Sequence, residues 1–237
     1  MNSYIIAFRA DSCSGAPSRG QRLENLQAVL KWVSQLGIDE IIVVEQDRES
    51  RLPSGFLPAG CKSVFAFNEG PFNKSWGFNI GFKQSSGDVL AFGDADILID
   101  SKNLLESFAL CHADADAVNP YDRLIDLTAE ETSAFLQTGN GLAAMPSRQI
   151  VNREPIGEFL CFCGGLFVIR RNVFEVLGGF DERFVGWGGE DDAMSIKLDK
   201  LVFNTQSVSG QPAYHLFHAR HRSRLDGHSH YAQNVAC

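Results

Sequence analysis

Short apolar runs rich in β-branched residues recur along the first part of the chain and alternate with segments of helical spacing. The runs are Tyr4–Phe8, Ile41–Val44, Val64–Phe67 and Val89–Phe92. A continuous apolar run is typical of a strand that is buried on both faces of a sheet. Because strand and helix signals alternate, the sequence predicts an α/β fold with a largely parallel sheet and helices on both faces.

The segments between these runs predict the helices. Leu23, Leu26, Leu30 and Val33 repeat at helical intervals, and Gly37 follows where such a helix would stop. Further helices are expected over Lys74–Gln84, Lys102–Cys111, Asn172–Leu177 and from the acidic cluster at 190–192 to about Leu201, and further strands at Ala117–Val118 and within Phe159–Ile169. Ser18 with Gln21, and Thr128 with Glu131, have the spacing of capping boxes. The segment Thr138–Gly157 has little periodicity and is expected to form a loop near the site.

Composition restricts the class of protein. The chain has 237 residues, 44% of them hydrophobic and 21% charged, as in soluble globular proteins. Its net charge of −8 argues against general nucleic-acid binding. The N-terminus has no secretory signal pattern, and no apolar run is long enough to span a bilayer. We therefore expect a cytoplasmic protein, and peripheral attachment to the inner face of a membrane stays open.

The cysteines do not suggest a metal or redox motif. Six cysteines are scattered along the chain without Cys-x-x-Cys spacing. Cys161 and Cys163 lie in an apolar stretch, which favours reduced cysteines in the core.

Asp94-Ala95-Asp96 follows the run Val89–Phe92 directly. Residues two apart in an extended segment point the same way, so both carboxylates could face one cation. Aspartate suits hard cations such as Mg²⁺ or Mn²⁺, which bind diphosphate oxygens. The same pattern also occurs as an acidic turn that closes a strand. In parallel sheets ligands bind beyond the carboxyl ends of the strands, where this pair lies.

His215 and His218 are spaced three apart among Tyr214, Leu216 and Phe217. Neutral imidazole is a good ligand for Mn²⁺ or Zn²⁺, and a carboxylate with one or two imidazoles suits a borderline cation. The apolar neighbours are equally consistent with hydrogen-bonded core histidines. Both interpretations stay open.

The stretch Gly186-Trp187-Gly188-Gly189-Glu190-Asp191-Asp192 places three acids where a loop turns into a helix. Asp191, Met194, Leu198 and Leu201 are spaced along one helical face, so Asp191 is expected to point inward. A carboxylate that points inward at a helix start serves either as a buried cap or as a general base.

Basic residues follow several of these elements. Arg9 follows the first strand, Lys74 begins a helix, and Arg220, Arg222 and Arg224 follow His218. Any of them could neutralise a diphosphate, although most surface arginines and lysines have no specific role.

These pieces, in this order, resemble the inverting glycosyltransferases of the GT-A fold, especially the β-1,4-galactosyltransferase and chondroitin-polymerase-like group. The resemblance extends over nearly the whole chain, through Ala7-Phe8-Arg9, Phe72-Asn73-Lys74, Asn79-Ile80-Gly81-Phe82, Asp94-Ala95-Asp96, Gly164-Gly165, Gly178-Gly179-Phe180, the Trp-Gly-Gly-Glu-Asp element and His215-x-x-His218. It implies a single α/β domain of the GT-A (Rossmann-like) fold over 1–237, with a mixed, mostly parallel central sheet flanked by helices. A nucleotide-binding half would lie at about 1–100 and an acceptor and catalytic half at about 101–237.

The resemblance also implies a role for each matching residue. Asp191 would be the catalytic base, and Asp96, His215 and His218 would bind Mn²⁺ or Mg²⁺, with His215 standing where relatives often have methionine. The donor, a UDP-sugar, would be bound by Phe8, Arg9, Lys74, Asn79, Asp94, Ala95, Gly165, Trp187, Gly189 and Glu190. The acceptor would be a glycan or related hydroxyl compound, which Asp191 would activate for a single displacement.

Two other functions use similar residues. A sugar-phosphate nucleotidyltransferase also combines an α/β sheet with paired acids on Mg²⁺, but that class needs a glycine-rich, basic loop after strand one. Residues 10–20 hold two glycines and one arginine, which disfavours it. A non-catalytic nucleotide-sugar or carbohydrate-binding module needs no inward-facing base. The sequence does not indicate the donor sugar, the acceptor or the oligomeric state.

Overall fold

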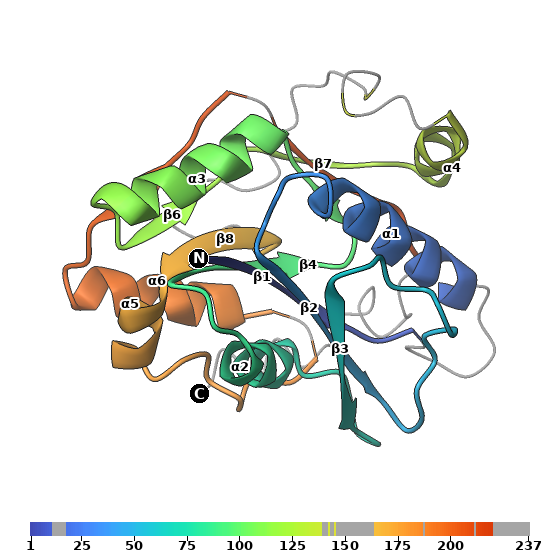
Figure 1. Ribbon diagram of the computed structural model, residues 1–237, viewed down its shortest axis with the longest axis horizontal. Coiled ribbons are helices and arrows are strands. Elements are labelled where there is room, and N and C mark those ends of the chain that lie inside the picture. Colours follow the sequence, from blue (N-terminus) through green and yellow to red (C-terminus); the bar gives the residue numbers. More distant parts are fainter. Residues whose placement is uncertain are drawn as a thin grey trace.

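Four predicted strands form one half of a seven-stranded sheet (Figure 1). They are β1 (Asn2–Phe8), β2 (Glu40–Asp47), β3 (Cys61–Phe67) and β4 (Val89–Asp94), all parallel, in the order β3-β2-β1-β4. Beyond β4 the sheet continues with β8 (Leu166–Arg170), which is antiparallel, and then with β6 (Ala117–Asn119) and β9 (Thr205–Ser207). The predicted mixed, mostly parallel sheet is confirmed.

Helices cover both faces of this sheet (Figure 1). On one face, α1 (Ser18–Val33) and α3 (Ser101–Ala113) bury Leu26, Leu30, Leu104 and Phe108 against the strands. On the other face lie α2 (Lys74–Gln84), α5 (Arg171–Val176) and α6 (Glu190–Lys200). The core on that face is rich in phenylalanine rings, whose centroids lie about 5 Å apart. The two helical layers fix the strand ends from which the site is built.

A small second sheet lies beside the end of β4. It consists of β5 (Ile97–Leu98), β10 (Ala213–His215) and β7 (Leu124–Asp126), with β10 in the centre. β10 is antiparallel to β5 and parallel to β7, and α4 (Ala129–Thr138) follows β7. This sheet joins the C-terminal segment of the described chain to the Asp94-Ala95-Asp96 turn.

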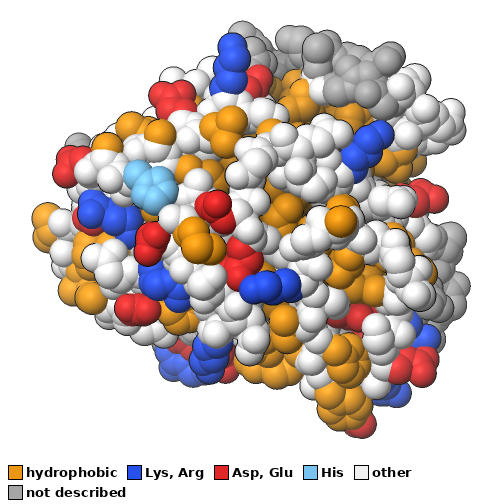
Figure 2. Space-filling model, in the orientation of Figure 1, with side chains coloured by type: hydrophobic (Ala, Val, Ile, Leu, Met, Phe, Trp, Pro, Cys, Tyr) orange, Lys and Arg blue, Asp and Glu red, His pale blue; other side chains and the backbone are white. Residues whose placement is uncertain are grey.

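The structure, a computed structural model, describes residues 1–10, 18–138, 142, 145, 164–186, 188–210 and 212–219, without the side chains of 18 and 19. Within those residues no helix has the length and apolar character needed to cross a bilayer. On the face seen in Figure 2, acidic and basic side chains are interspersed among apolar ones and form no continuous basic surface. Most of the expected Thr138–Gly157 loop, together with Cys161 and Cys163, lies outside the described residues.

Local capping signals explain the starts of α3 and α4. Asp100 caps α3 by accepting a hydrogen bond from Lys102 N at 2.7 Å. The capping box of Thr128 and Glu131 forms reciprocally ahead of α4. One expectation was wrong: Leu201 is 55% exposed, because α6 ends at Lys200 and the next residue turns out of the apolar face. The buried residues of α6 are Met194, Ser195 and Leu198.

Candidate active site and metal centre

The Asp94-Ala95-Asp96 turn connects the end of β4 to β5 at the carboxyl edge of the parallel strands. Asp94 N donates a 2.7 Å hydrogen bond to the carbonyl of Gly165, next to β8. Gly165 is required by space, since a Cβ atom there would lie 2.7 Å from the hydroxyl of Tyr121. Ala95 packs against the main core. The turn thus has a fixed backbone, and its two acids lie at the switch from the large sheet to the small one.

Lys74, the first residue of α2, holds Asp94 and the start of α6 together. Its Nζ lies 2.8 Å from Asp94 Oδ1 and 3.4 Å from Glu190 Oε1. Burial opposes the charge of Lys74, but Asp94, Glu190 and Asp191 outweigh burial and raise the pKa of its ammonium group. Burial also raises the pKa of Asp94 to about 6, although Lys74 offsets part of this effect and Asp96 adds to it. Several acids therefore share this lysine, and the cluster favours an additional cation.

The first turn of α6 begins at a glycine with positive φ. Gly189 precedes the helix with φ of +92°, a left-handed conformation that favours glycine. Glu190 and Asp191 follow, and both line a pocket together with Lys74 and Gly165. The other walls of the pocket are apolar, including the rings of Phe78, Phe92, Phe167 and Phe180. Asp191 thus faces a pocket that combines apolar walls with a buried ammonium group.

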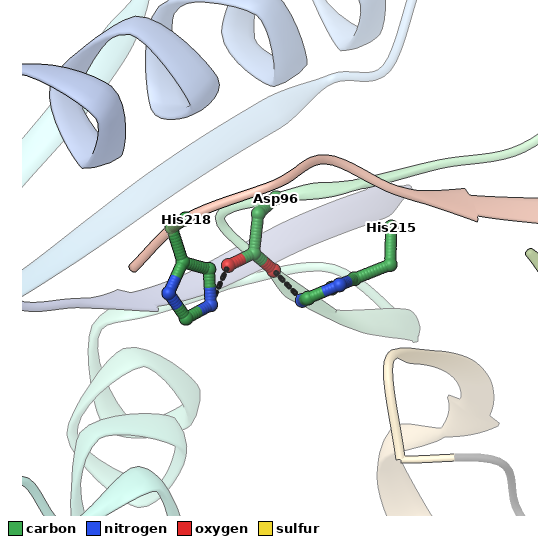
Figure 3. Close-up of side chains that lie close together, drawn as sticks. All are labelled: Asp96, His215 and His218. Atoms are coloured by element: carbon green, nitrogen blue, oxygen red, sulfur yellow. Dashed lines mark ion pairs between the residues drawn. The ribbon is translucent and has the colours of Figure 1, made fainter. Parts of the chain in front are cut away.

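Asp96 faces the two histidines (Figure 3). His218 Nε2 lies 3.2 Å from Asp96 Oδ2, and His215 Nε2 lies 3.6 Å from Asp96 Oδ1. One possible ligand atom from each of these residues lies within 4.8 Å of the others. Burial would raise the pKa of Asp96, but His215 and the bond from His218 outweigh burial and hold it well below its usual range. An ionised carboxylate with two imidazoles fits a divalent cation of borderline character.

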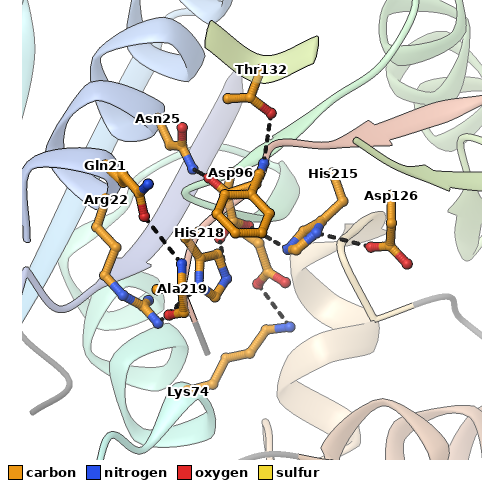
Figure 4. Close-up of polar contacts among 12 residues, drawn as sticks. Gln21, Arg22, Asn25, Lys74, Asp96, Asp126, Thr132, His215, His218 and Ala219 are labelled. Carbon is orange, nitrogen blue, oxygen red and sulfur yellow. Dashed lines mark hydrogen bonds and ion pairs between the residues drawn. The ribbon is translucent and has the colours of Figure 1, made fainter. Parts of the chain in front are cut away.

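A network of polar contacts holds the segment that carries the histidines (Figure 4). Leu216 N donates to the carbonyl of Asp96 at 2.8 Å, so this segment runs alongside the acidic turn. Thr132 Oγ1 of α4 accepts a 2.8 Å hydrogen bond from Phe217 N. From α1, Asn25 donates to the carbonyl of Phe217 and Gln21 accepts from Ala219 N, both at 3.1 Å. Two helices thus fix the backbone on either side of His218.

Some predicted donor-binding residues have structural contacts. Arg9 donates to the carbonyls of Gln46, Asn68 and Gly70, at 2.7, 2.9 and 2.6 Å, and so ties together the loops that follow β1 and β3. Asn79 binds Phe180 through both its carboxamide oxygen and its nitrogen. Phe8 is buried in the main core, and Trp187 lies outside the described residues. Donor binding by these four residues stays a prediction.

The structure therefore brings Lys74, Asp94, Asp96, Gly165, Glu190, Asp191, His215 and His218 to one edge of the fold. Sequence reasoning missed the residues that hold this group. Asp126 lies 3.0 Å from His215 Nδ1, and a terminal nitrogen of Arg22 lies 3.2 Å from His218 Nδ1. The capping box at Thr128 predicts the helix on which Thr132 lies, but no local pattern identifies Asp126 or Arg22, because both meet the histidines only through tertiary structure.

Known proteins with similar sequences point to one family. The model of the family described as "Glycosyltransferase like family 2" matches residues 63–236. Human chondroitin sulfate N-acetylgalactosaminyltransferase 2 is 29% identical over 167 residues, which cover 68% of this chain and 29% of the human protein. The chain therefore spans less than a third of that relative.

Solved structures share the fold at low sequence identity. Glucosyl-3-phosphoglycerate synthase from Mycobacterium tuberculosis, in complex with Mn²⁺, UDP and phosphoglyceric acid, is 15% identical with a TM-score of 0.59, over 99% of this chain and 76% of that one. A mannosyltransferase from Pyrobaculum calidifontis, in complex with GDP-Man and Mn²⁺, is 15% identical with a TM-score of 0.58, over 100% of this chain and 64% of that one. At these identities the match establishes the fold.

Proposed function

The chain belongs to the glycosyltransferase-like family 2, and on this premise we propose that it is a metal-dependent, inverting hexosyltransferase. It moves a hexose or an N-acetylhexosamine from a UDP-sugar to a hydroxyl group of a glycan or related acceptor. The observation that carries this proposal is the pair of adjoining clusters at the end of β4. A set of cation ligands lies on one side of the turn, and an inward-facing acid with a buried lysine lies on the other.

The cation site consists of Asp96, His215 and His218, whose donor atoms suit Mn²⁺ better than Mg²⁺ because two of the three are imidazole nitrogens. When bound, the cation supplies positive charge against the leaving diphosphate. Lys74 adds a fixed ammonium group close by and donates to diphosphate oxygens. Asp94 and Glu190 both pair with Lys74; Asp94 orients the nucleoside side of the donor, and Glu190 binds its sugar.

Asp191 acts as the general base. It takes the proton of the acceptor hydroxyl while that oxygen attacks the anomeric carbon, and the bond to the diphosphate breaks on the opposite face. Trp187 stacks on the sugars where donor and acceptor meet. Residues at about 1–100 then supply most of the donor site, and residues at about 101–237 supply the base and the acceptor site.

The decisive experiment replaces two neighbouring acids of α6 separately. Asp191→Asn should lower turnover on the order of 100-fold or more, because general base catalysis contributes about that much, while UDP binding stays near the parent value. Asp192→Asn is the matched control and should stay within about threefold of the parent. The readout is release of UDP from a panel of UDP-sugars with Mn²⁺, with and without glycan acceptors. Full transfer by the Asp191→Asn protein would falsify the assignment of the base.

The same panel tests the other functions. Release of pyrophosphate during exchange would instead support a nucleotidyltransferase, and binding of UDP-sugars without turnover would support a non-catalytic module.

A further inference from the structure

Asp126 and His215 lie side by side on the small sheet. Asp126 ends β7 and His215 ends β10, and the two residues are register partners. On its other side His215 pairs with Ile97 of β5, the residue that follows Asp96. Since neighbouring strands lie about 5 Å apart, the three strands bring Asp126, the imidazole and the acidic turn into one row. Figure 3 shows Asp96 facing the ring of His215, and Figure 4 shows Asp126 on the other side of that ring.

The contacts select one tautomer of His215. Its Nδ1 lies 3.0 Å from Asp126 Oδ1, and its Nε2 lies 3.6 Å from Asp96 Oδ1. An ionised carboxylate only accepts hydrogen bonds, so the short contact to Asp126 places the proton on Nδ1. Nε2 is then the ring nitrogen on the side of Asp96, which is the side of the cation site. A histidine needs this tautomer and orientation to bind a cation through Nε2.

Asp126 acts through His215 and does not itself bind the cation. Its side chain is 52% exposed, whereas that of Asp96 is 13% exposed. Asp126 is also absent from the group of ligand atoms that Asp96, His215 and His218 form within the described residues. We propose that Asp126 is a positioning residue that holds His215 in its cation-binding tautomer. This inference rests on the proposed metal-dependent function.

His218 provides an internal contrast. Its Nδ1 lies 3.2 Å from a terminal nitrogen of Arg22 and 3.2 Å from the carbonyl oxygen of Ala219. Arginine only donates, so the Arg22 contact favours a lone pair on Nδ1 and a proton on Nε2, toward Asp96. His215 thus already has the tautomer that binds a cation through Nε2, whereas His218 has its proton on Nε2. Loss of Asp126 should therefore affect His215, the ligand whose tautomer already suits the cation.

The test measures binding of Mn²⁺ alone, by electron paramagnetic resonance of the free ion, to the full chain. Asp126→Ala should weaken Mn²⁺ binding about tenfold or more, as loss of an outer hydrogen-bond partner typically does. Asp126→Asn should recover part of this loss, because its amide oxygen still accepts from Nδ1. Asp122→Asn is the matched control: Asp122 is also half-exposed and close to β7, and it pairs with Arg123 instead of a histidine. This control should bind Mn²⁺ as the parent does.

A second readout follows the tautomer directly. Long-range proton–nitrogen NMR spectra of the metal-free protein should show the proton of His215 on Nδ1, and on Nε2 in Asp126→Ala. Unchanged Mn²⁺ affinity or an unchanged tautomer in Asp126→Ala overturns the positioning role while leaving the proposed function intact. Failure of the parent itself to bind Mn²⁺ overturns the metal-dependent function and this inference together. The melting temperature without metal should stay within about 2 °C of the parent, because Asp126 is half-exposed.

Discussion

Both ends of the parallel strands carry buried acids, but the two ends differ in how those acids are balanced. At the amino end, Glu40 begins β2 and is 5% exposed. It accepts hydrogen bonds from Ser3 Oγ at 2.7 Å and Ser86 N at 2.9 Å, and it pairs with Lys62. Burial favours the neutral acid, but the bonds from Lys62, Ser3 and Ser86 outweigh burial and lower the pKa of Glu40. Glu40 therefore joins the starts of β1, β2 and β3 as a balanced structural acid.

At the carboxyl end the acids exceed their fixed positive partners. Lys74 faces Asp94, Glu190 and Asp191, and burial raises the pKa of Asp94 to about 6 despite that lysine. Asp96 faces the imidazoles of His215 and His218. Burial alone therefore does not distinguish a structural acid from a functional one. An excess of buried acids indicates a place that favours a cation from outside the chain.

The largest effect should come from the acid that faces the histidines. Asp96→Ala removes the carboxylate from the cation site and should abolish detectable Mn²⁺ binding, with turnover reduced on the order of 1000-fold, as expected when a metal-bound electrophile is lost. The counterpart at the amino end, Glu40→Gln, should bind Mn²⁺ like the parent. Titration with Mn²⁺ and release of UDP measure the two quantities. Equal Mn²⁺ affinity in parent and Asp96→Ala would contradict the comparison.

The two lysines provide a second contrast. Lys74→Met leaves Asp94 and Glu190 without their ammonium partner and should destabilise the metal-free protein by about 3 kcal/mol, the usual cost of breaking a buried ion pair. Lys62→Met should cost less than about 1 kcal/mol, because Lys62 is largely exposed and Glu40 keeps Ser3 and Ser86. Urea unfolding in the presence of a chelator measures both. Similar losses of unfolding free energy in Lys74→Met and Lys62→Met would contradict the difference in charge balance between the two ends.

Much of the fold could be predicted from the sequence, because its larger elements are periodic. The bounds of α2 are those expected, and the predicted strands of the large sheet lie in the expected segments. The family assignment and the class of enzyme, a glycosyltransferase, are confirmed by the family match. The inverting mechanism, the choice of UDP-sugar, the cytoplasmic location and the roles of the site residues stay predictions.

The small sheet could not be predicted, and it is the part that shapes the cation site. β5, β7 and β10 have two or three residues each, which is too short for a period-two pattern to appear. Arg9 and Asn79 bond mainly to backbone groups that are distant in sequence, so their spacing in sequence carries no signal. The spacing of His215 and His218 indicated a possible site, but the acid that orients His215 became visible only through the pairing of β7 with β10.

Acidification should weaken the contribution of Glu40, at the amino end of the strands, to the stability of the fold. The pKa of Glu40 is lowered in the folded protein, so its stabilisation is present above its ordinary value near 4.5 and is lost as the pH falls through the lowered value. At pH 7, Glu40→Gln should cost about 2 kcal/mol, since hydrogen bonds to a charged group are lost, and near pH 3 the difference from the parent should shrink. Glu49→Gln, an exposed acid, is the control and should show little change at either pH. Thermal unfolding across this range measures the effect, and a difference that grows with acidification would contradict it.

The smallest effect concerns Arg22, which places a positive charge beside the cation site. Its guanidinium lies 3.2 Å from His218 Nδ1 and helps to keep Asp96 ionised. In Arg22→Gln the ring of His218 can carry its proton on Nδ1, toward the carbonyl of Ala219, and can turn its Nε2 lone pair to the cation. Mn²⁺ binding to the protein without donor should therefore tighten about threefold, an effect of less than 1 kcal/mol. Lys31→Gln, at the exposed far end of α1, is the control. Weaker Mn²⁺ binding in Arg22→Gln than in the parent would mean that this arginine supports the site by keeping Asp96 ionised more than it opposes the cation.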